Sequence, residues 1–145
     1  MIAAEAVDAM RTALLPRAWL VMPNLEEAAH LTGRKVTTVV EMRDAARALV
    51  DLGARAALVK GGHLDGEAID VLFDGSGFHE FAAARVHTAH THGTGCTYSA
   101  AVTAGLASGV DLADAIQRAK EFVTRAIETN PGLGRGQGPL NYWAS

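Results

Sequence analysis

The chain of 145 residues is long enough for one domain with a buried core and too short for two of ordinary size. Hydrophobic residues make up 49% of it and charged residues 20%, values that exclude a disordered tail and a fibrous repeat. Its 13 lysine and arginine residues are scattered and are outnumbered by 16 acidic residues, which argues against a surface that binds nucleic acid.

The single cysteine, Cys96, excludes an internal disulfide and fits a reducing compartment, so we expect a cytoplasmic protein. No stretch reaches the roughly 18 consecutive apolar residues that a membrane helix needs. The N-terminal segment lacks a basic leader ahead of an apolar run and does not resemble a signal peptide. We therefore expect neither a membrane nor a nucleic acid as partner.

Hydrophobic periodicity and turn residues predict four strands and five helices. In chain order they are a helix over 3–14, a strand over 19–22, helices over 24–33 and 38–53, strands over 56–60, 68–74 and 78–86, a helix over 94–108, and a last helix that Asp111 caps and that runs to 127. The segment over 131–145 is a glycine-rich tail whose first part is too rich in turn-forming residues for another element.

The helix boundaries have local signals. Pro16 stops the first helix, and Asn24 is expected to cap the second, which ends near Gly33. Thr38 followed by Glu41 has the spacing of a capping box.

The alternation of helices and strands is typical of an α/β protein. The strands over 19–22 and 56–60 are apolar on both faces, as in a parallel sheet covered by helices. The strands over 68–74 and 78–86 are close enough to form a hairpin. We predict a mostly parallel sheet with one antiparallel hairpin.

The strand over 19–22 has the composition of an interior strand, yet no strand precedes it in the chain. It is therefore either an exposed apolar edge or an edge that another chain or a missing segment covers.

The strongest local motif is His-Thr-His-Gly-Thr-Gly-Cys-Thr over 90–97, a glycine-containing turn that leads into a helix. Exposed N–H groups and the helix dipole favour a negative oxygen at such a place, so the turn is a candidate phosphate or oxyanion site. A thiolate at Cys96, in the first turn, would act as a base or nucleophile. The alternative is an ordinary helix start with a buried small residue.

The histidines His87, His90 and His92 raise the question of zinc, because alternate residues of a strand or loop converge on one side. Their spacing to the one cysteine does not match the usual closed zinc sites, and we expect surface or loop histidines.

Four further side chains have a functional and a structural interpretation. Asn24 and Glu27, at the end of a buried strand, would hold magnesium through water or form a capping pair. Lys60 closes the strand over 56–60, before Gly61 and Gly62, and would reach a phosphate at the same sheet edge or face solvent. Lys120 is expected at a solvated flank of the last helix.

The tail also has two interpretations. Arg135 in the glycine-rich stretch would close over an anion, or the terminus simply frays.

Four segments together resemble one known family: 22–28 (Met-Pro-Asn-Leu-Glu-Glu-Ala), 58–63 (Leu-Val-Lys-Gly-Gly-His), 90–96 and 136–141 (Gly-Gln-Gly-Pro-Leu-Asn). In order and spacing they are similar to the hydroxymethylpyrimidine and hydroxymethylpyrimidine-phosphate kinases of thiamine biosynthesis, which belong to the ribokinase-like superfamily. The resemblance extends over essentially the whole chain, but only to the C-terminal half of such a kinase. It implies a three-layer α/β/α fold in a single partial domain over 1–145, and the absent half would explain the open strand over 19–22.

The resemblance implies transfer of a phosphoryl group from magnesium ATP to a small pyrimidine. It assigns Gly93, Thr94 and Gly95 to the anion hole, with Cys96 at the catalytic position that is Asp in many sugar-kinase relatives.

The remaining matches concern the nucleotide and the metal. Asn24 and Glu27 match the magnesium–phosphate motif, and Lys60 and Lys120 match lysines that steady the transferring phosphate. Lys60, Gly61, Gly62, Thr94 and Gly95 would then contact the nucleotide.

Two positions depart from the family pattern, since Tyr142 stands where relatives often have His, and His87 stands where an acidic residue is common.

Because the half that would supply most of the pyrimidine pocket is absent, the isolated chain is not expected to turn over. An alternative is a non-catalytic module that associates through the edge over 19–22, with a second copy or with a separate N-terminal half. A third hypothesis is a hydrolase with Cys96 as nucleophile.

Overall fold

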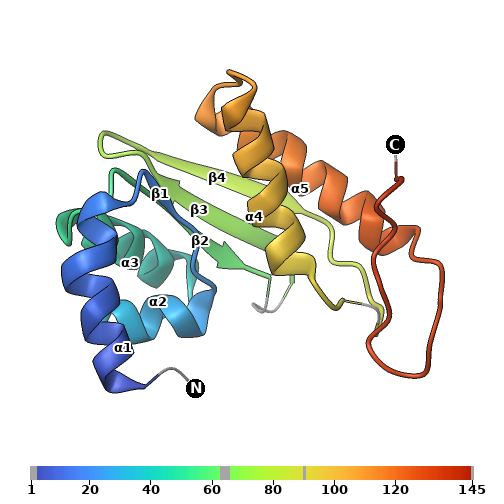
Figure 1. The fold of residues 1–145 in the computed structure, drawn as a ribbon, viewed down its shortest axis with the longest axis horizontal. Coiled ribbons are helices and arrows are strands. Elements are labelled where there is room, and N and C mark those ends of the chain that lie inside the picture. Colours follow the sequence, from blue (N-terminus) through green and yellow to red (C-terminus); the bar gives the residue numbers. More distant parts are fainter. Residues whose placement is uncertain (1–2, 63–65, 90, 145) are drawn as a thin grey trace. The chain divides into compact units, whose positions relative to one another are not determined.

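The computed structural model describes residues 3–62, 66–89 and 91–144. The chain divides into two compact units, Met1–Ala82 and Ala83–Ser145. Figure 1 labels the helices and strands of both. No helix in the described ranges combines the length and the hydrophobicity that crossing a membrane requires.

The first unit holds the sheet and the N-terminal helices. Its elements are α1 (Ala4–Ala9), β1 (Leu20–Val21), α2 (Leu25–Thr32), α3 (Val39–Asp51), β2 (Ala56–Gly61), β3 (Ala68–Phe73) and β4 (Phe78–Ala83), which reaches the boundary of the unit. The predicted order of helices and strands is confirmed. Strand β4 ends at Ala83, three residues before its predicted end.

The first helical segment is longer than predicted. After α1 the chain continues through a π turn over Met10–Leu14 and a 3₁₀ turn over Leu15–Arg17. Pro16 does not stop it, because it lies in the first turn of the 3₁₀ segment, where a missing N–H costs no hydrogen bond.

The sheet has the strand order β1-β2-β3-β4. Strand β1 pairs with β2 in parallel, and β2 pairs with β3 antiparallel. The antiparallel part therefore extends one pair beyond the hairpin that the sequence predicts. Strand β1 is at the edge, and β2 is its one neighbour among the described strands, as the lack of an earlier strand predicts.

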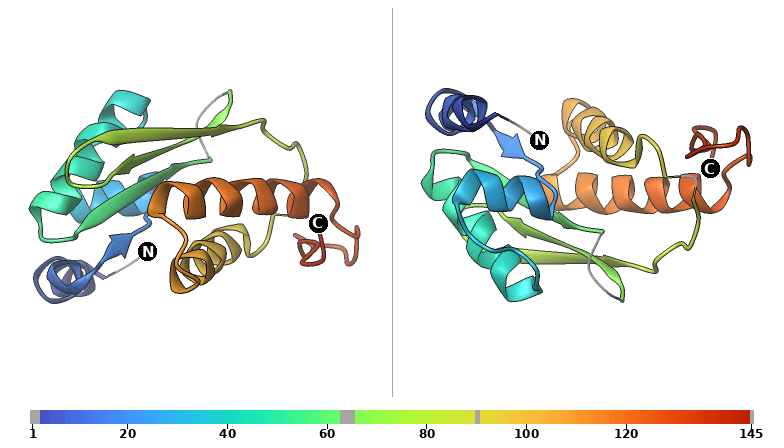
Figure 2. Two further views of the ribbon diagram at one scale, coloured as in Figure 1. Left: turned by 90° about the horizontal axis from the view of Figure 1, so that it is seen from above. Right: turned by 90° about the horizontal axis from the view of Figure 1, so that it is seen from below.

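Both faces of the sheet are apolar. Helix α3 packs against β2 and β3, and α2 lies against α3 and β2 (Figure 2). Ala57, Val59 and Val71 belong to the apolar cluster that includes residues of these helices. Leu58 and Leu72 are directly opposite each other and alternate with these residues, so they point to the other face, where they are also buried.

Local capping sets the starts of α2 and α3. The Asn24 side chain accepts from the Glu27 N–H, and the Glu27 carboxylate accepts from the Asn24 N–H, both at 2.8 Å. Thr38 and Glu41 form the same reciprocal pair at the start of α3. Both predicted helix starts are confirmed.

The second unit contains α4 (Thr94–Ala107) and α5 (Leu112–Glu128), which pack against each other. Their approach is close, because a Cβ added at Gly105 would lie 3.1 Å from the Cβ of Ala115. Asp111 stands at the N-cap position of α5 as predicted, but its side chain makes no capping hydrogen bond.

The end of the tail is held in place. Leu140 is 2% exposed, the Asn141 N–H donates to the Ala126 carbonyl at 2.9 Å, and the Asn141 amide donates to the Thr129 hydroxyl at 3.0 Å. The expectation of a frayed terminus is therefore wrong for this segment, because tertiary hydrogen bonds to α5 replace the missing local structure. Arg135, earlier in the tail, is exposed.

The turn between β3 and β4 is built on one carboxylate. Asp74 Oδ1 accepts from the Ser76 N–H, the Ser76 hydroxyl and the Gly77 N–H, each at 2.8 Å. The backbone N–H groups of Gly77 and Ser76 hold the pKa of Asp74 well below its usual value of 3.8.

We expect Asp74→Ala to lower the free energy of unfolding by about 1 kcal/mol at neutral pH, because the donors of Ser76, Gly77 and His79 lose their acceptor. The folded chain keeps this carboxyl ionised to lower pH than the unfolded chain does. Its contribution is therefore complete well above pH 3.8 and is lost as the pH falls through the lowered pKa of the folded state. Urea unfolding of both proteins over a pH series measures this.

Asp74→Asn is the control, because its amide oxygen still accepts but does not titrate. We expect it to keep most of the stability and to lose the pH dependence. If the free energies of unfolding of the wild type and Asp74→Ala differ by the same amount at every pH, the ionised Asp74 carboxylate does not stabilise the turn.

Candidate functional site

Helix α4 begins with the turn over 93–96. Gly93 is the N-cap residue and has a φ of 82°, in the left-handed region that favours glycine. The Thr94 hydroxyl donates to the Thr91 carbonyl at 2.7 Å, and the Thr97 N–H donates to the Gly93 carbonyl at 2.9 Å. The Thr94 side chain is thus occupied in fixing the turn.

Two backbone N–H groups of this turn remain for a ligand. In the described part of the chain, nothing accepts a hydrogen bond from the N–H of Gly95 or Cys96. Both residues are exposed, so the alternative of a buried small residue is wrong. Two such N–H groups at the positive end of a helix dipole favour an anion.

The tail brings a hydroxyl to the same turn. The Tyr142 hydroxyl lies 3.6 Å from the position that a Cβ would take on Gly93. The hydroxyl therefore lies beside the turn, and the residue as a whole is 54% exposed. The sequence marks this position only as a departure from the family pattern and does not predict the contact.

Asn24, Glu27 and Lys60 meet in the first unit, where β1 and β2 end. The Lys60 N–H donates to the Pro23 carbonyl at 2.9 Å, and Asn24 and Lys60 form an isolated parallel bridge. Because parallel strands end at the same edge, ligands of open α/β sheets gather there. The predicted grouping of these residues is confirmed.

The capping interpretation of Asn24 and Glu27 is confirmed by their reciprocal bonds. It is compatible with a metal held through water, because a carboxylate has about four acceptor positions and an amide oxygen two. Magnesium typically keeps several waters beside one or two carboxylates and substrate phosphates, so these two residues fit it.

The described residues contain no group of three or more His, Cys, Asp and Glu side chains that could hold a metal. His87 and His92 are exposed, and His90 lies outside the described residues. These observations give the zinc alternative no support.

The two glycines after Lys60 have different surroundings. A Cβ added at Gly61 would lie 2.0 Å from the Ile69 carbonyl oxygen, so no side chain fits there. A Cβ at Gly62 would meet nothing within 4 Å among the described residues. Gly61 therefore lets β2 and β3 approach, and Gly62 is exposed.

The sequence does not predict two buried charged residues. Lys120 is 7% exposed on α5, so the expected solvated position is wrong. Asp70, in the middle of β3, is 3% exposed and accepts from the Gly61 N–H at 3.0 Å. The available signal for Asp70 was a charge inside the otherwise apolar run Ala-Ile-Asp-Val-Leu-Phe over 68–73.

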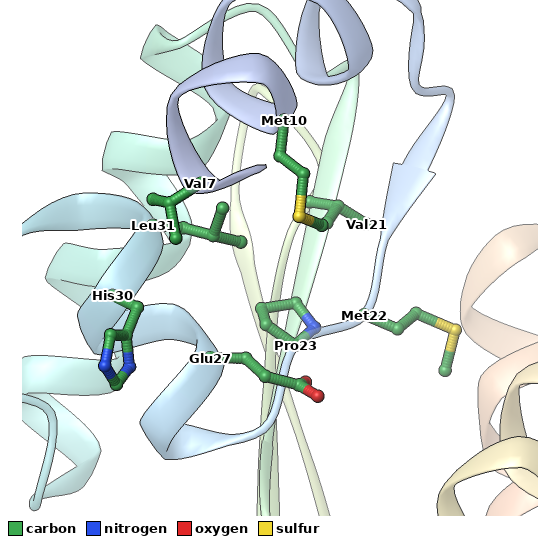
Figure 3. A pocket seen from close by; sticks show the side chains of 8 residues that line it. All are labelled: Val7, Met10, Val21, Met22, Pro23, Glu27, His30 and Leu31. Carbon is green, nitrogen blue, oxygen red and sulfur yellow. The ribbon is translucent and has the colours of Figure 1, made fainter. Parts of the chain in front are cut away.

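A cavity of about 190 Å³ lies in the first unit, with Glu27 as part of its wall (Figure 3). Met10, Val21 and Leu31 line it from three different segments, and His30 adds a second polar side chain. A mostly apolar wall does not suit a polyphosphate, so we do not place a nucleotide there.

Comparison with known proteins places the chain in a kinase family. Residues 1–141 match the family described as phosphomethylpyrimidine kinase. The chain belongs to this family. It is 48% identical over 145 residues to a hydroxymethylpyrimidine/phosphomethylpyrimidine kinase of Streptomyces coelicolor, covering 99% of this chain and 54% of that relative.

One further relative and one solved structure are also similar to this member of the phosphomethylpyrimidine kinase family. The thiamine biosynthesis bifunctional protein ThiED of Geobacter sulfurreducens is 49% identical over 138 residues, which cover 94% of this chain and 28% of that protein. A Bacillus subtilis pyridoxal kinase, solved as an ADP complex, matches with a TM-score of 0.93 at 40% identity, over 99% of this chain and 57% of that one.

These matches confirm the ribokinase-like α/β fold that the resemblance implies. The chain spans about half the length of the Streptomyces coelicolor kinase, and it matches the C-terminal half.

Proposed function

We propose that the chain supplies the nucleotide side and the anion hole of a kinase in thiamine biosynthesis. The reaction transfers the terminal phosphoryl group of ATP to hydroxymethylpyrimidine or to its monophosphate. The observation that carries the proposal is the pair of N–H groups at Gly95 and Cys96, which are exposed and without a protein acceptor in the described residues. The relatives named above, one of them solved with ADP, support the choice of reaction and nucleotide.

The proposed chemistry is mainly positioning and charge stabilisation. An acceptor oxygen attacks the terminal phosphorus, and the bond from that phosphorus to the oxygen bridging to ADP breaks. The N–H groups of the 93–96 turn hold the equatorial phosphate oxygens, on which negative charge is spread. Lys60 and Lys120 are the two lysines that the family resemblance assigns to phosphate charge. Magnesium held near Asn24 and Glu27 would neutralise the charge on the phosphates.

The role of Cys96 depends on the acceptor. A hydroxyl must lose its proton, and the Cys96 thiolate would take it. A phosphate monoester, whose second pKa is about 6, is already largely ionised at neutral pH and needs little help. An exposed thiol in this position suits the reducing cytoplasm, where we expect the protein to act.

The test combines this chain with the N-terminal half of the Streptomyces coelicolor relative, added separately or fused. ADP formation is measured with hydroxymethylpyrimidine, its monophosphate or pyridoxal as acceptor. We expect transfer to the two pyrimidines only when both halves are present. Absence of phosphoryl transfer with both halves present contradicts the proposal. Faster transfer to pyridoxal than to the pyrimidines would contradict the proposed acceptor.

Cys96→Ala is expected to reduce kcat for the hydroxyl acceptor by a factor of about 10² to 10³, the usual contribution of a general base. For the phosphate acceptor we expect a loss of less than about tenfold, since no proton must be removed there. Steady-state rates with both acceptors in the two-half enzyme measure the difference. Equal losses contradict the role as base, and a covalent substrate adduct on Cys96 would favour a hydrolase.

A second proposal concerns the edge of the sheet. In the described residues β1 pairs with β2 alone, and two large apolar side chains that precede β1 in the chain, Leu14 and Trp19, are 54% and 47% exposed. An exposed apolar strand edge is a place where another strand adds. A separate N-terminal half or a second copy of the chain would cover it. Analytical ultracentrifugation of the chain, alone and with that half, distinguishes the two partners.

A further inference from the structure

Asp70 is a buried carboxylate in the centre of a strand. It is 3% exposed, although its neighbours in sequence, Ile69 and Val71, are apolar. Aspartate is almost never buried to this degree without a hydrogen-bonding role, because an isolated buried charge is costly. The position of its hydrogen bond indicates what that role is.

The carboxylate bonds to the end of β2. Asp70 Oδ1 accepts from the Gly61 N–H at 3.0 Å, and Asp70 stands directly opposite Lys60 in the register of β2 and β3. Because directly opposite residues share a face of a sheet, the Asp70 carboxylate and the Lys60 side chain leave the sheet on the same side.

The segment is thus fixed from both sides. On the β1 side the Lys60 N–H donates to the Pro23 carbonyl at 2.9 Å. On the β3 side the Gly61 N–H donates to Asp70, and the absence of a side chain at Gly61 allows the close approach to Ile69. The backbone is therefore held at the point where it leaves β2 towards Gly62.

We infer that Asp70 is a positioning residue, which acts through Gly61 to hold Lys60 and Gly62 in the geometry that binds the nucleotide phosphates. The inference rests on the proposed function and adds a residue to it. A group held by a fixed supporting partner binds without a reorganisation cost, and a displacement of about 1 Å lowers rates by around 10²-fold.

The experiment measures binding of the ATP analogue AMP-PCP, with magnesium, to the full chain by calorimetry, at a temperature where every variant is folded. Asp70→Ala is expected to weaken binding about tenfold or more. Asp70→Asn is expected to stay within about threefold of the wild type, because its amide oxygen still accepts from Gly61. Hydrogen exchange at the Gly61 amide should be faster in Asp70→Ala and near normal in Asp70→Asn.

Val71→Ala is the matched control. It removes buried methyl groups from the same strand and leaves the bond between Asp70 and Gly61 intact, so we expect it to lower stability and to leave binding unchanged. Binding by Asp70→Ala that equals the wild type, or that falls only as far as in Val71→Ala, overturns the inference. Failure of the wild-type chain to bind the analogue is a different result, which overturns the proposed nucleotide site and the inference with it.

Discussion

Replacing Gly61 by alanine is expected to destabilise the first unit by about 3 kcal/mol, at the upper end of the cost of overpacking a core. The new Cβ would lie 2.0 Å from the Ile69 carbonyl oxygen and 2.9 Å from the Met42 Cε. The methionine side chain can move, but the carbonyl belongs to the backbone of β3, which is paired with β2. Relief of this clash therefore requires the two strands to separate.

Gly62→Ala is the matched control for this prediction. In the described part of the chain its Cβ would meet nothing within 4 Å, and Gly62 is exposed, so we expect a change of less than about 0.5 kcal/mol. Urea unfolding followed by circular dichroism measures both variants. Equal stabilities of Gly61→Ala and the wild type would show that β2 and β3 do not approach as closely as described.

Lys120→Met is expected to lower kcat in the two-half enzyme by a factor of about 10² to 10³, the usual cost of removing one group that stabilises transition-state charge. Lys120 is 7% exposed, so water screens its ammonium little and a nearby phosphate would experience it strongly. Methionine fills a similar volume without the charge, so kcat is measured per folded molecule, and the free energy of unfolding is measured alongside it.

Arg118→Met, at an exposed position of the same helix, is the control for a general charge effect and should leave kcat unchanged. A large loss of stability in Lys120→Met, with kcat of the folded fraction unchanged, would show that the lysine supports the fold only.

The helix starts and the family motifs could be predicted because they depend on neighbouring residues. Asn24 with Glu27, and Thr38 with Glu41, satisfy each other's N–H groups within one turn, so their spacing is sufficient. Likewise the start of α4 at Gly93 follows from a glycine-containing turn that leads into a helix. The grouping of Asn24 and Lys60 also followed, because two parallel strands end at one edge.

The burial of charged residues could not be predicted in this way. Lys120 lies beside the apolar stripe of α5 and has the pattern of a solvated residue, yet it is buried. Asp70 interrupts an apolar strand, and only the register of β2 and β3 shows that it bonds to Gly61. The catalytic and binding roles of the site residues remain predictions.

The sequence by itself thus determined the order of helices and strands and the capping pairs of α2 and α3, since hydrogen bonds and periodicity within a few residues fix these features. Its motifs determined the phosphomethylpyrimidine kinase family. Only the tertiary structure decided that Lys120 is buried, that Asp70 holds the Gly61 N–H, and that Tyr142 returns to the start of α4. Such features depend on residues that are not neighbours in the sequence. Their contribution to stability depends on which groups the fold brings together and shields from water.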